Sequence, residues 1–154
     1  MIYQRILVPY DGSKHSKKAL AHAAQIAKSS DAIIYLCSII TTQNVVPPGA
    51  LLGLVKEASH GTLQKRLITS AKIQMEKEHV EQIKYCDKIG VRAFSKILVS
   101  GNISQEILGV ARKKSADLIV IGSQGLHGVA KIKSLGSVSR KISENASCPV
   151  LIVR

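Results

Sequence analysis

The strongest constraint on the fold is a regular alternation of short apolar runs with longer stretches of helical periodicity. The runs are rich in Ile, Val and Leu and predict strands over 5–9, 32–40, 92–100, 117–122 and 149–153. Between them, apolar residues recur every three or four positions, which predicts helices over 14–28, 62–88, from 102 onward, and 136–145. Strands that alternate with helices indicate a parallel sheet with helices on both faces. We therefore predict one α/β domain over residues 1–154.

Capping residues support several of these boundaries. Ser13 precedes the first helix and can accept a hydrogen bond from a backbone N–H of its first turn. Asn102 is followed three residues later by Gln105, which is typical of a capping box. Gly90 predicts the end of the long helix. The segment 41–61, with Pro47-Pro48-Gly49, is predicted to be a mobile loop.

Composition indicates what kind of core the protein has and where in the cell it is expected. Aromatic residues make up only 3% of the chain, so we expect an aliphatic core. No apolar run approaches the roughly 20 residues that span a bilayer, and the N-terminus has no apolar stretch of signal-peptide length. We therefore expect a cytoplasmic protein that does not enter a membrane. Three cysteines without a CxxC pair indicate buried free thiols.

The chain is basic, with a formal net charge of +12 spread along its length. Such a surface attracts phosphates of any kind. It has neither a basic tail nor aromatic residues interleaved with the basic ones, so the pattern argues against nucleic acid as a specific partner.

Residues that follow the strands are the candidates for a binding site, because open parallel sheets bind ligands beyond the carboxyl ends of their strands. Gly122 and Gly125 follow the fourth strand, and Gly136 and Ser137 begin the last helix. Glycines allow close approach of backbone N–H groups, and a helix N-terminus favours anions. This group suits a phosphate, and the nearby basic residues are Lys131, Lys133 and Arg140.

Asp11 follows the first strand and has two possible roles. Its carboxylate could bind the sugar or base of a nucleotide, or it could cap the first helix together with Ser13. The two roles do not exclude each other.

Several other kinds of site are not indicated. The chain has no GxxxxGK[ST] motif and no GxGxxG after the first strand, which argues against a P-loop and a dinucleotide fingerprint. Ser123, Ser137 and His127 have no evident acid to orient a hydrolytic pair. The histidines lack metal-ligand spacing and are predicted to be surface residues: His15, His22, His60, His79 and His127.

Five segments together carry a family resemblance: Ile6-Leu-Val-Pro-Tyr-Asp-Gly-Ser13, Gly101-Asn102, Asp117-Leu-Ile-Val-Ile-Gly-Ser-Gln-Gly125, Leu135-Gly-Ser-Val-Ser-Arg-Lys141 and Cys148-Pro-Val-Leu-Ile-Val153. Taken in this order along the chain, they resemble the universal stress protein family. The resemblance implies an adenine nucleotide alpha hydrolase-like, Rossmann-like sheet of five strands in the order 3-2-1-4-5. It also implies a homodimer that pairs through the last strand, here Val150 to Val153.

One branch of this family binds ATP through a G-x2-G-x9-G-[ST] motif. Here ten residues, not nine, separate Gly125 from Gly136. The resemblance implies ATP or AMP as ligand, with or without Mg²⁺. It places Pro9 and Asp11 at the nucleoside, the backbone of Ser38 at the adenine, and the phosphates against Gly122, Gly125, Gly136, Ser137 and Val138.

The sequence leaves three functions open. The first is a nucleotide-dependent switch in the stress response that is recognised by an unknown protein partner. The second is a dimer that binds a protein or nucleic acid without nucleotide. The third is a slow ATP hydrolase, for which Asp11 is the only carboxylate predicted near the site.

Overall fold

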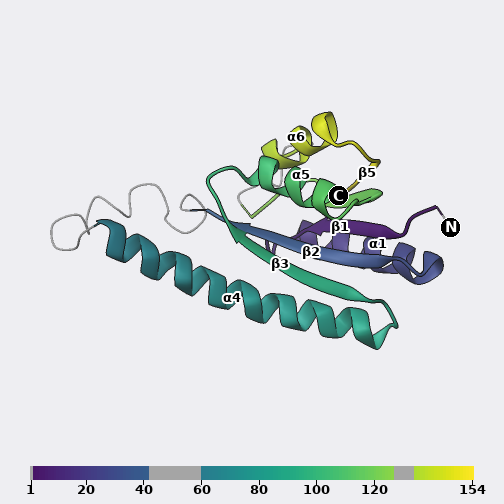
Figure 1. Ribbon diagram of the computed structural model, residues 1–154, viewed down its shortest axis with the longest axis horizontal. Helices are drawn as coiled ribbons and strands as arrows, with labels where there is room; N and C mark the ends of the chain where they lie inside the picture. The colour runs from purple at the N-terminus through teal and green to yellow at the C-terminus, as the bar shows by residue number, and fades with distance from the viewer. Residues whose placement is uncertain (1, 42–59, 127–133) are drawn as a thin grey trace.

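The computed structural model describes residues 2–41, 60–126 and 134–154 and contains a parallel five-stranded sheet in the order β3-β2-β1-β4-β5 (Figure 1). The predicted strand order and the alternation of strands with helices are confirmed, with boundaries within two residues of the prediction. The elements are β1 (Arg5–Pro9), α1 (Lys14–Ser30), β2 (Ile33–Ile40), α4 (His60–Lys88), β3 (Ala93–Val99), α5 (Ile103–Lys113), β4 (Leu118–Gly122), α6 (Ser137–Asn145) and β5 (Val150–Val153).

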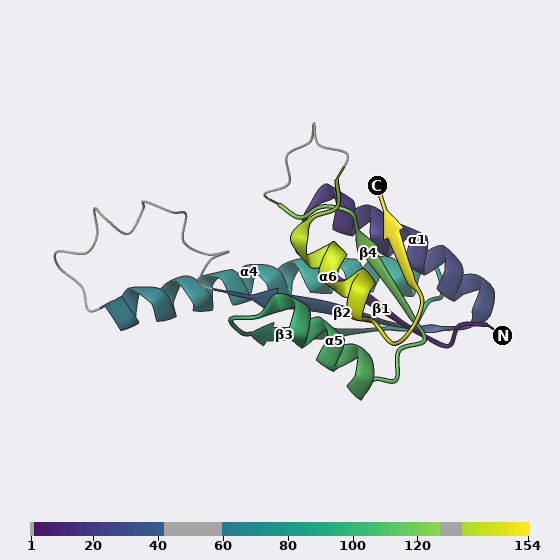
Figure 2. The same ribbon diagram turned by 90° about the horizontal axis from the view of Figure 1, so that it is seen from above.

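The helices form a layer on each face of the sheet. Helices α1 and α4 lie on one face, and α5 and α6 lie on the other (Figures 1 and 2). Each face has its own aliphatic core, and the central strand β1 contributes to both: Ile6 and Val8 point toward α1, whereas Leu7 points toward α5 and α6. All three side chains are fully buried, as expected for a parallel strand covered on both sides.

Local capping follows the sequence signals. Ser13 Oγ accepts a hydrogen bond from Ser16 N at 3.1 Å, and Asn102 Oδ1 accepts one from Gln105 N at 3.1 Å. The N–H of Asn102 itself bonds to Ser100 Oγ at 3.3 Å, where a full capping box would use Gln105. Gly90 follows α4 with a φ of +78°, a conformation that glycine adopts without steric cost.

Some expectations need correction. The predicted loop 41–61 falls largely on residues 42–59, outside the described residues, but 60–61 already belong to α4. Cys37 and Cys86 are buried as predicted, whereas Cys148 is only half-buried. Within the described ranges, no helix is both long and apolar enough to cross a membrane.

Candidate binding cavity at the carboxyl edge of the sheet

A cavity of about 390 Å³ lies beyond the carboxyl ends of β1, β2 and β4. The chain leaves β1 toward β2 and later returns to β4 on the other side, so the cavity sits where the strand order reverses. Its volume falls in the range of small-molecule sites. Its lining residues are Pro9, Tyr10, Asp11, Ser16, Cys37, Ile39, Ile103, Ile107, Ile121, Gly122, Gln124, Gly125, Leu126, Gly136, Ser137, Val138 and Ser139.

Most of the predicted site residues meet at this cavity. The predicted residues that line it are Pro9, Asp11, Gly122, Gly125, Gly136, Ser137 and Val138. Ser38 does not line it, because side chains alternate along a strand and its hydroxyl points to the α4 face. Its neighbours Cys37 and Ile39 line the cavity instead. The predicted backbone contact of Ser38 with a ligand stays a prediction.

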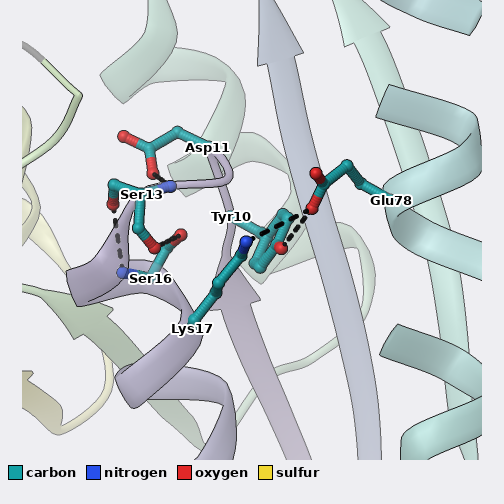
Figure 3. Close-up of polar contacts among 6 residues, drawn as sticks. All are labelled: Tyr10, Asp11, Ser13, Ser16, Lys17 and Glu78. Carbon is teal, nitrogen blue, oxygen red and sulfur yellow. Dashed lines mark hydrogen bonds and ion pairs between the residues drawn. The ribbon is translucent and has the colours of Figure 1, made fainter. Parts of the chain in front are cut away.

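Asp11 connects two loops at the cavity edge. Its Oδ1 atom accepts a hydrogen bond from Ser13 N at 2.9 Å, within the turn that leads into α1 (Figure 3). Its Oδ2 atom accepts one from Leu126 N at 3.2 Å, in the loop after β4. Asp11 therefore holds the turn before α1, whose cap is Ser13 itself, and the same carboxylate also accepts from the start of the second loop.

The first two predicted glycines are required by packing. A Cβ on Gly122 would lie 2.8 Å from both the carbonyl carbon and the Cβ of His15, in the first turn of α1. A Cβ on Gly125 would lie 2.9 Å from Asp11 Oδ2. Both glycines therefore let α1 and its preceding turn pack against the end of β4.

The start of α6 supplies the polar wall of the cavity. Gly136 N donates to Ser123 O at 2.8 Å, so this amide is already used within the protein. The next N–H groups, of Ser137 and Val138, belong to the first turn and have no acceptor within the helix. They lie at the positive end of the helix dipole, which favours an anion. Lys131 and Lys133 lie outside the described residues, and Arg140 is exposed.

An apolar wall formed by β2, β4 and α5 completes the cavity. Ile39, Ile121 and Ile107 are buried there, and Cys37 lies between them with 1% exposure. Burial raises the pKa of the Cys37 thiol to about 12, so the thiol is neutral and behaves as a small apolar group. One wall of amides and one wall of aliphatic groups suit a ligand with an anionic end and a flat apolar end.

Tyr10 links the cavity floor to the helices on the far side of the sheet, a role that the sequence reasoning missed. The residue lines the cavity, yet its hydroxyl donates to Glu78 Oε2 of α4 at 2.8 Å. Lys17 of α1 lies 3.9 Å from the same carboxylate oxygen (Figure 3). Burial raises the pKa of Tyr10, and the hydrogen bond to Glu78 raises it further, so the phenol stays protonated.

His79 of α4 corrects the prediction that the histidines lie at the surface. Its side chain is 1% exposed, with Nε2 2.7 Å from Ser38 Oγ and Nδ1 2.6 Å from Ser95 Oγ. Burial lowers its pKa to about 4, although Glu78 acts in the opposite direction. The sequence held a signal for this position: His79 falls on the inward stripe of α4 between Met75 and Ile83.

Of the other four histidines, the structure describes the side chains of two. His22 is exposed and His15 is half-buried, whereas His127 and the side chain of His60 lie outside the described residues. Among the described residues, no group of three or more His, Cys, Asp or Glu side chains is placed to hold a metal ion.

Sequence comparison gives a consistent match along the whole chain. The model of the universal stress protein family matches residues 2–154. Universal stress protein MJ0531 of Methanocaldococcus jannaschii is 35% identical over 153 residues, covering 99% of this chain and 83% of the relative. Universal stress protein YxiE of Bacillus subtilis is 35% identical over 158 residues, covering 99% and 100%.

Solved structures agree on the fold. Universal stress protein UspA from Lactobacillus plantarum has a TM-score of 0.82 at 20% identity and covers 100% of this chain and 99% of its own. A universal stress protein in complex with cAMP has a TM-score of 0.63 at 23% identity, and the match covers 100% of this chain and 98% of that one. One from Archaeoglobus fulgidus in complex with dAMP has a TM-score of 0.58 at 22% identity, with both chains fully covered.

Proposed function

This chain belongs to the universal stress protein family, and on that basis we propose that it binds an adenine nucleotide in the cavity beyond β1, β2 and β4. The observation that carries the proposal is the pairing of an aliphatic wall with a helix N-terminus in one cavity of about 390 Å³. The cAMP and dAMP complexes of proteins with the same fold support an adenine nucleotide as the ligand class.

The nucleobase would occupy the aliphatic side of the cavity. Ile39 and Ile107 are buried there beside the neutral thiol of Cys37, and Ile103 stands at the start of α5. A flat purine gains from leaving water for such a wall, because apolar burial is worth about 25 cal/mol per Å². Pro9 and Asp11 would lie beside the sugar.

The phosphate would bind at the start of α6. The N–H groups of Ser137 and Val138 lack acceptors within the helix, and the hydroxyl of Ser137 adds a donor. Gly122 and Gly125 line the same cavity, and their lack of a side chain lets α1 and Asp11 pack against the end of β4 beside it. The proposal covers ATP and AMP, with Mg²⁺ accompanying ATP.

We further propose that occupancy acts as a switch. A ligand here would touch both Asp11 and the residues that Asp11 holds, including Leu126. Such a ligand stabilises whichever arrangement of these loops binds it better, so nucleotide would change the surface offered to a partner protein. This binding role also accounts for Asp11 better than hydrolysis does, because its two carboxylate oxygens already accept backbone N–H groups.

The homodimer through Val150–Val153 is part of this proposal. Strand β5 lies at one edge of the sheet, and Leu151 is 37% exposed. No other strand of the described residues pairs with this edge, and such an edge is commonly covered by another strand.

Calorimetric titration of the purified protein tests the proposal. AMP, ATP and cAMP are titrated separately, with and without Mg²⁺, and inosine monophosphate serves as the control for the base. We expect saturable one-to-one binding of at least one adenine nucleotide. Absence of heat change for all of them, at protein concentrations that detect micromolar affinity, would overturn the proposal and favour a nucleotide-independent dimer.

A further inference from the structure

A second cluster of reactive groups lies between the sheet and α4, on the face of the sheet that α1 and α4 cover. His79 of α4 stands between Ser38 of β2 and Ser95 of β3, with contacts of 2.7 Å at Nε2 and 2.6 Å at Nδ1. A serine hydroxyl within hydrogen-bond reach of an imidazole, whose other nitrogen is held by a third group, is the arrangement of an activated nucleophile.

The hydrogen-bond network assigns the proton positions on His79. Ser38 Oγ donates its own proton to the carbonyl oxygen of Tyr10. Ser38 must therefore accept from His79, which places a proton on Nε2 and leaves the lone pair on Nδ1. The hydroxyl of Ser95 then donates to Nδ1. Ser38 is the positioning residue in this arrangement, and Nδ1 is the base.

The surroundings keep the imidazole neutral at pH 7. Burial lowers the pKa of His79 to about 4, and the smaller opposing effect of the Glu78 carboxylate does not offset it. The lone pair on Nδ1 is therefore available throughout the neutral pH range, although the low pKa makes His79 a weak base.

A cavity of about 290 Å³ opens beside this pair, between α4 and β3. Its walls include Val80 and Ile83, with Glu76 and Lys84 also in the lining. Ser95 belongs to the exposed outer strand, so a small molecule in this cavity can reach its hydroxyl. The aliphatic walls suit a short apolar acyl group.

The backbone of β3 offers a donor for the developing negative charge. Ile34 N bonds to Arg92 O and Ser100 N bonds to Ile40 O, so even-numbered residues of β3 direct their peptide groups toward β2. Peptide direction alternates along a strand, which turns the N–H of Ser95 toward the outer side of β3, where the described residues add no further strand. This N–H belongs to the same residue as the hydroxyl, which makes it the candidate donor to an oxyanion formed at Ser95.

We propose that Ser95 and His79 form a nucleophile–base pair that takes acyl groups from small carboxylic esters. Ser95 Oγ attacks the ester carbonyl carbon while its proton passes to His79 Nδ1. The tetrahedral intermediate then expels the alcohol, which receives that proton, and leaves an acyl-serine. Water, deprotonated by His79, attacks the acyl-serine and releases the carboxylic acid and the free serine. No oxidant, metal or cofactor is needed.

Reaction of the nucleotide-free protein with p-nitrophenyl acetate tests this pair, and its result does not depend on nucleotide binding. Nitrophenolate release gives the rate, and peptide mass spectrometry locates the acetyl group. We expect acetylation at Ser95, with a rate at least tenfold lower in Ser95→Ala, since general-base catalysis contributes about 10²–10⁴-fold. Ser143→Ala, which removes an exposed serine on α6, should leave the rate unchanged.

The rate should also be constant between pH 6 and 8, because the base is neutral across that range. His79→Gln should lower it without changing the circular dichroism spectrum. Ser38→Ala should lower it too, and Ser38→Thr, which keeps the hydroxyl, should restore it. An acetyl group on a lysine or another histidine, a rate that rises steadily with pH, or an unchanged rate in Ser95→Ala would each overturn the proposal.

Discussion

Asp11 Oδ2 accepts a hydrogen bond at 3.2 Å from the backbone N–H of Leu126, a residue 115 positions further along the chain. The contact joins the loop after β1 to the loop after β4, the two loops that flank the cavity. Since Oδ1 of the same carboxylate holds Ser13, one side chain fixes both the start of α1 and the edge of the binding site.

Replacing the Asp11 carboxylate should lower the stability of the protein. In Asp11→Asn, one acceptor is exchanged for an N–H₂ group that cannot accept from Leu126. We expect the free energy of unfolding to fall by about 1 kcal/mol, since hydrogen bonds to charged groups are worth about 1.5–3 kcal/mol and this one is partly exposed. Urea denaturation measures the change. The matched control Asp31→Asn, at an exposed residue 3.9 Å from Arg92, should change it by less than about 0.5 kcal/mol. Equal effects would contradict the role assigned to Asp11.

Gly122 should be intolerant of even one methyl group. In Gly122→Ala the new Cβ would approach His15 backbone and Cβ atoms within 2.8 Å, so α1 must shift. Overpacking of this kind costs about 1–3 kcal/mol. Gly101→Ala, with no neighbouring atom within 4 Å of the added Cβ, is the control and should be close to neutral. The comparison uses protein without nucleotide, and a neutral Gly122→Ala would show that this glycine is not needed for packing.

His79 should make the fold less stable in acid. Its folded pKa of about 4 lies below the unfolded value of 6.5, so between these values the unfolded chain binds more protons than the folded one. The stability that His79 contributes is complete above pH 6.5 and is lost progressively as the pH falls toward 4. Each pKa unit corresponds to about 1.4 kcal/mol.

We therefore expect the wild type to lose about 2–3 kcal/mol more than His79→Gln between pH 7 and pH 4.5. Urea unfolding at the two pH values gives this difference, in which the titration of the carboxylates cancels. Identical losses in the two proteins would mean that His79 is protonated in the folded state.

Much of the architecture could be predicted because it depends on local periodicity. The apolar run around Val120 and the apolar stripe of α1 predict which residues are buried. Ser13 precedes the start of α1, and Gly90 follows the end of α4. The cavity residues after β1 and β4 followed from the rule that parallel sheets bind ligands at this edge.

The contacts across the sheet could not be predicted in the same way. Ser38 lies near the carboxyl end of β2, but the pleat of the strand decides which side chains face the cavity, and those are Cys37 and Ile39. The lack of metal-ligand spacing predicts a surface position for His79, but its burial depends on hydroxyl partners from two strands, β2 and β3. Such pairings over long sequence distances leave no local pattern.

The proposed dimer has a specific backbone test. Ile119 N bonds to Pro149 O, and Ser123 N bonds to Val153 O. The peptide groups of odd-numbered residues in β5 therefore point toward β4, and the N–H of Ile152 points outward. Ile152→Pro removes this outward N–H without removing a bond to β4. Sedimentation equilibrium should show a dimer for the wild type and at least tenfold weaker association for the variant. Monomeric wild type, or an unaffected variant, would contradict pairing through this edge.

The most direct test of the central claim is to fill the cavity. Ile103 lines its apolar wall, whereas Leu108, on the same helix and also half-buried, does not line it. We predict that Ile103→Trp weakens adenine-nucleotide binding at least tenfold in calorimetric titration, while Leu108→Trp binds as the wild type does, with both variants folded by circular dichroism. Unchanged binding by Ile103→Trp would show that the nucleotide does not occupy this cavity.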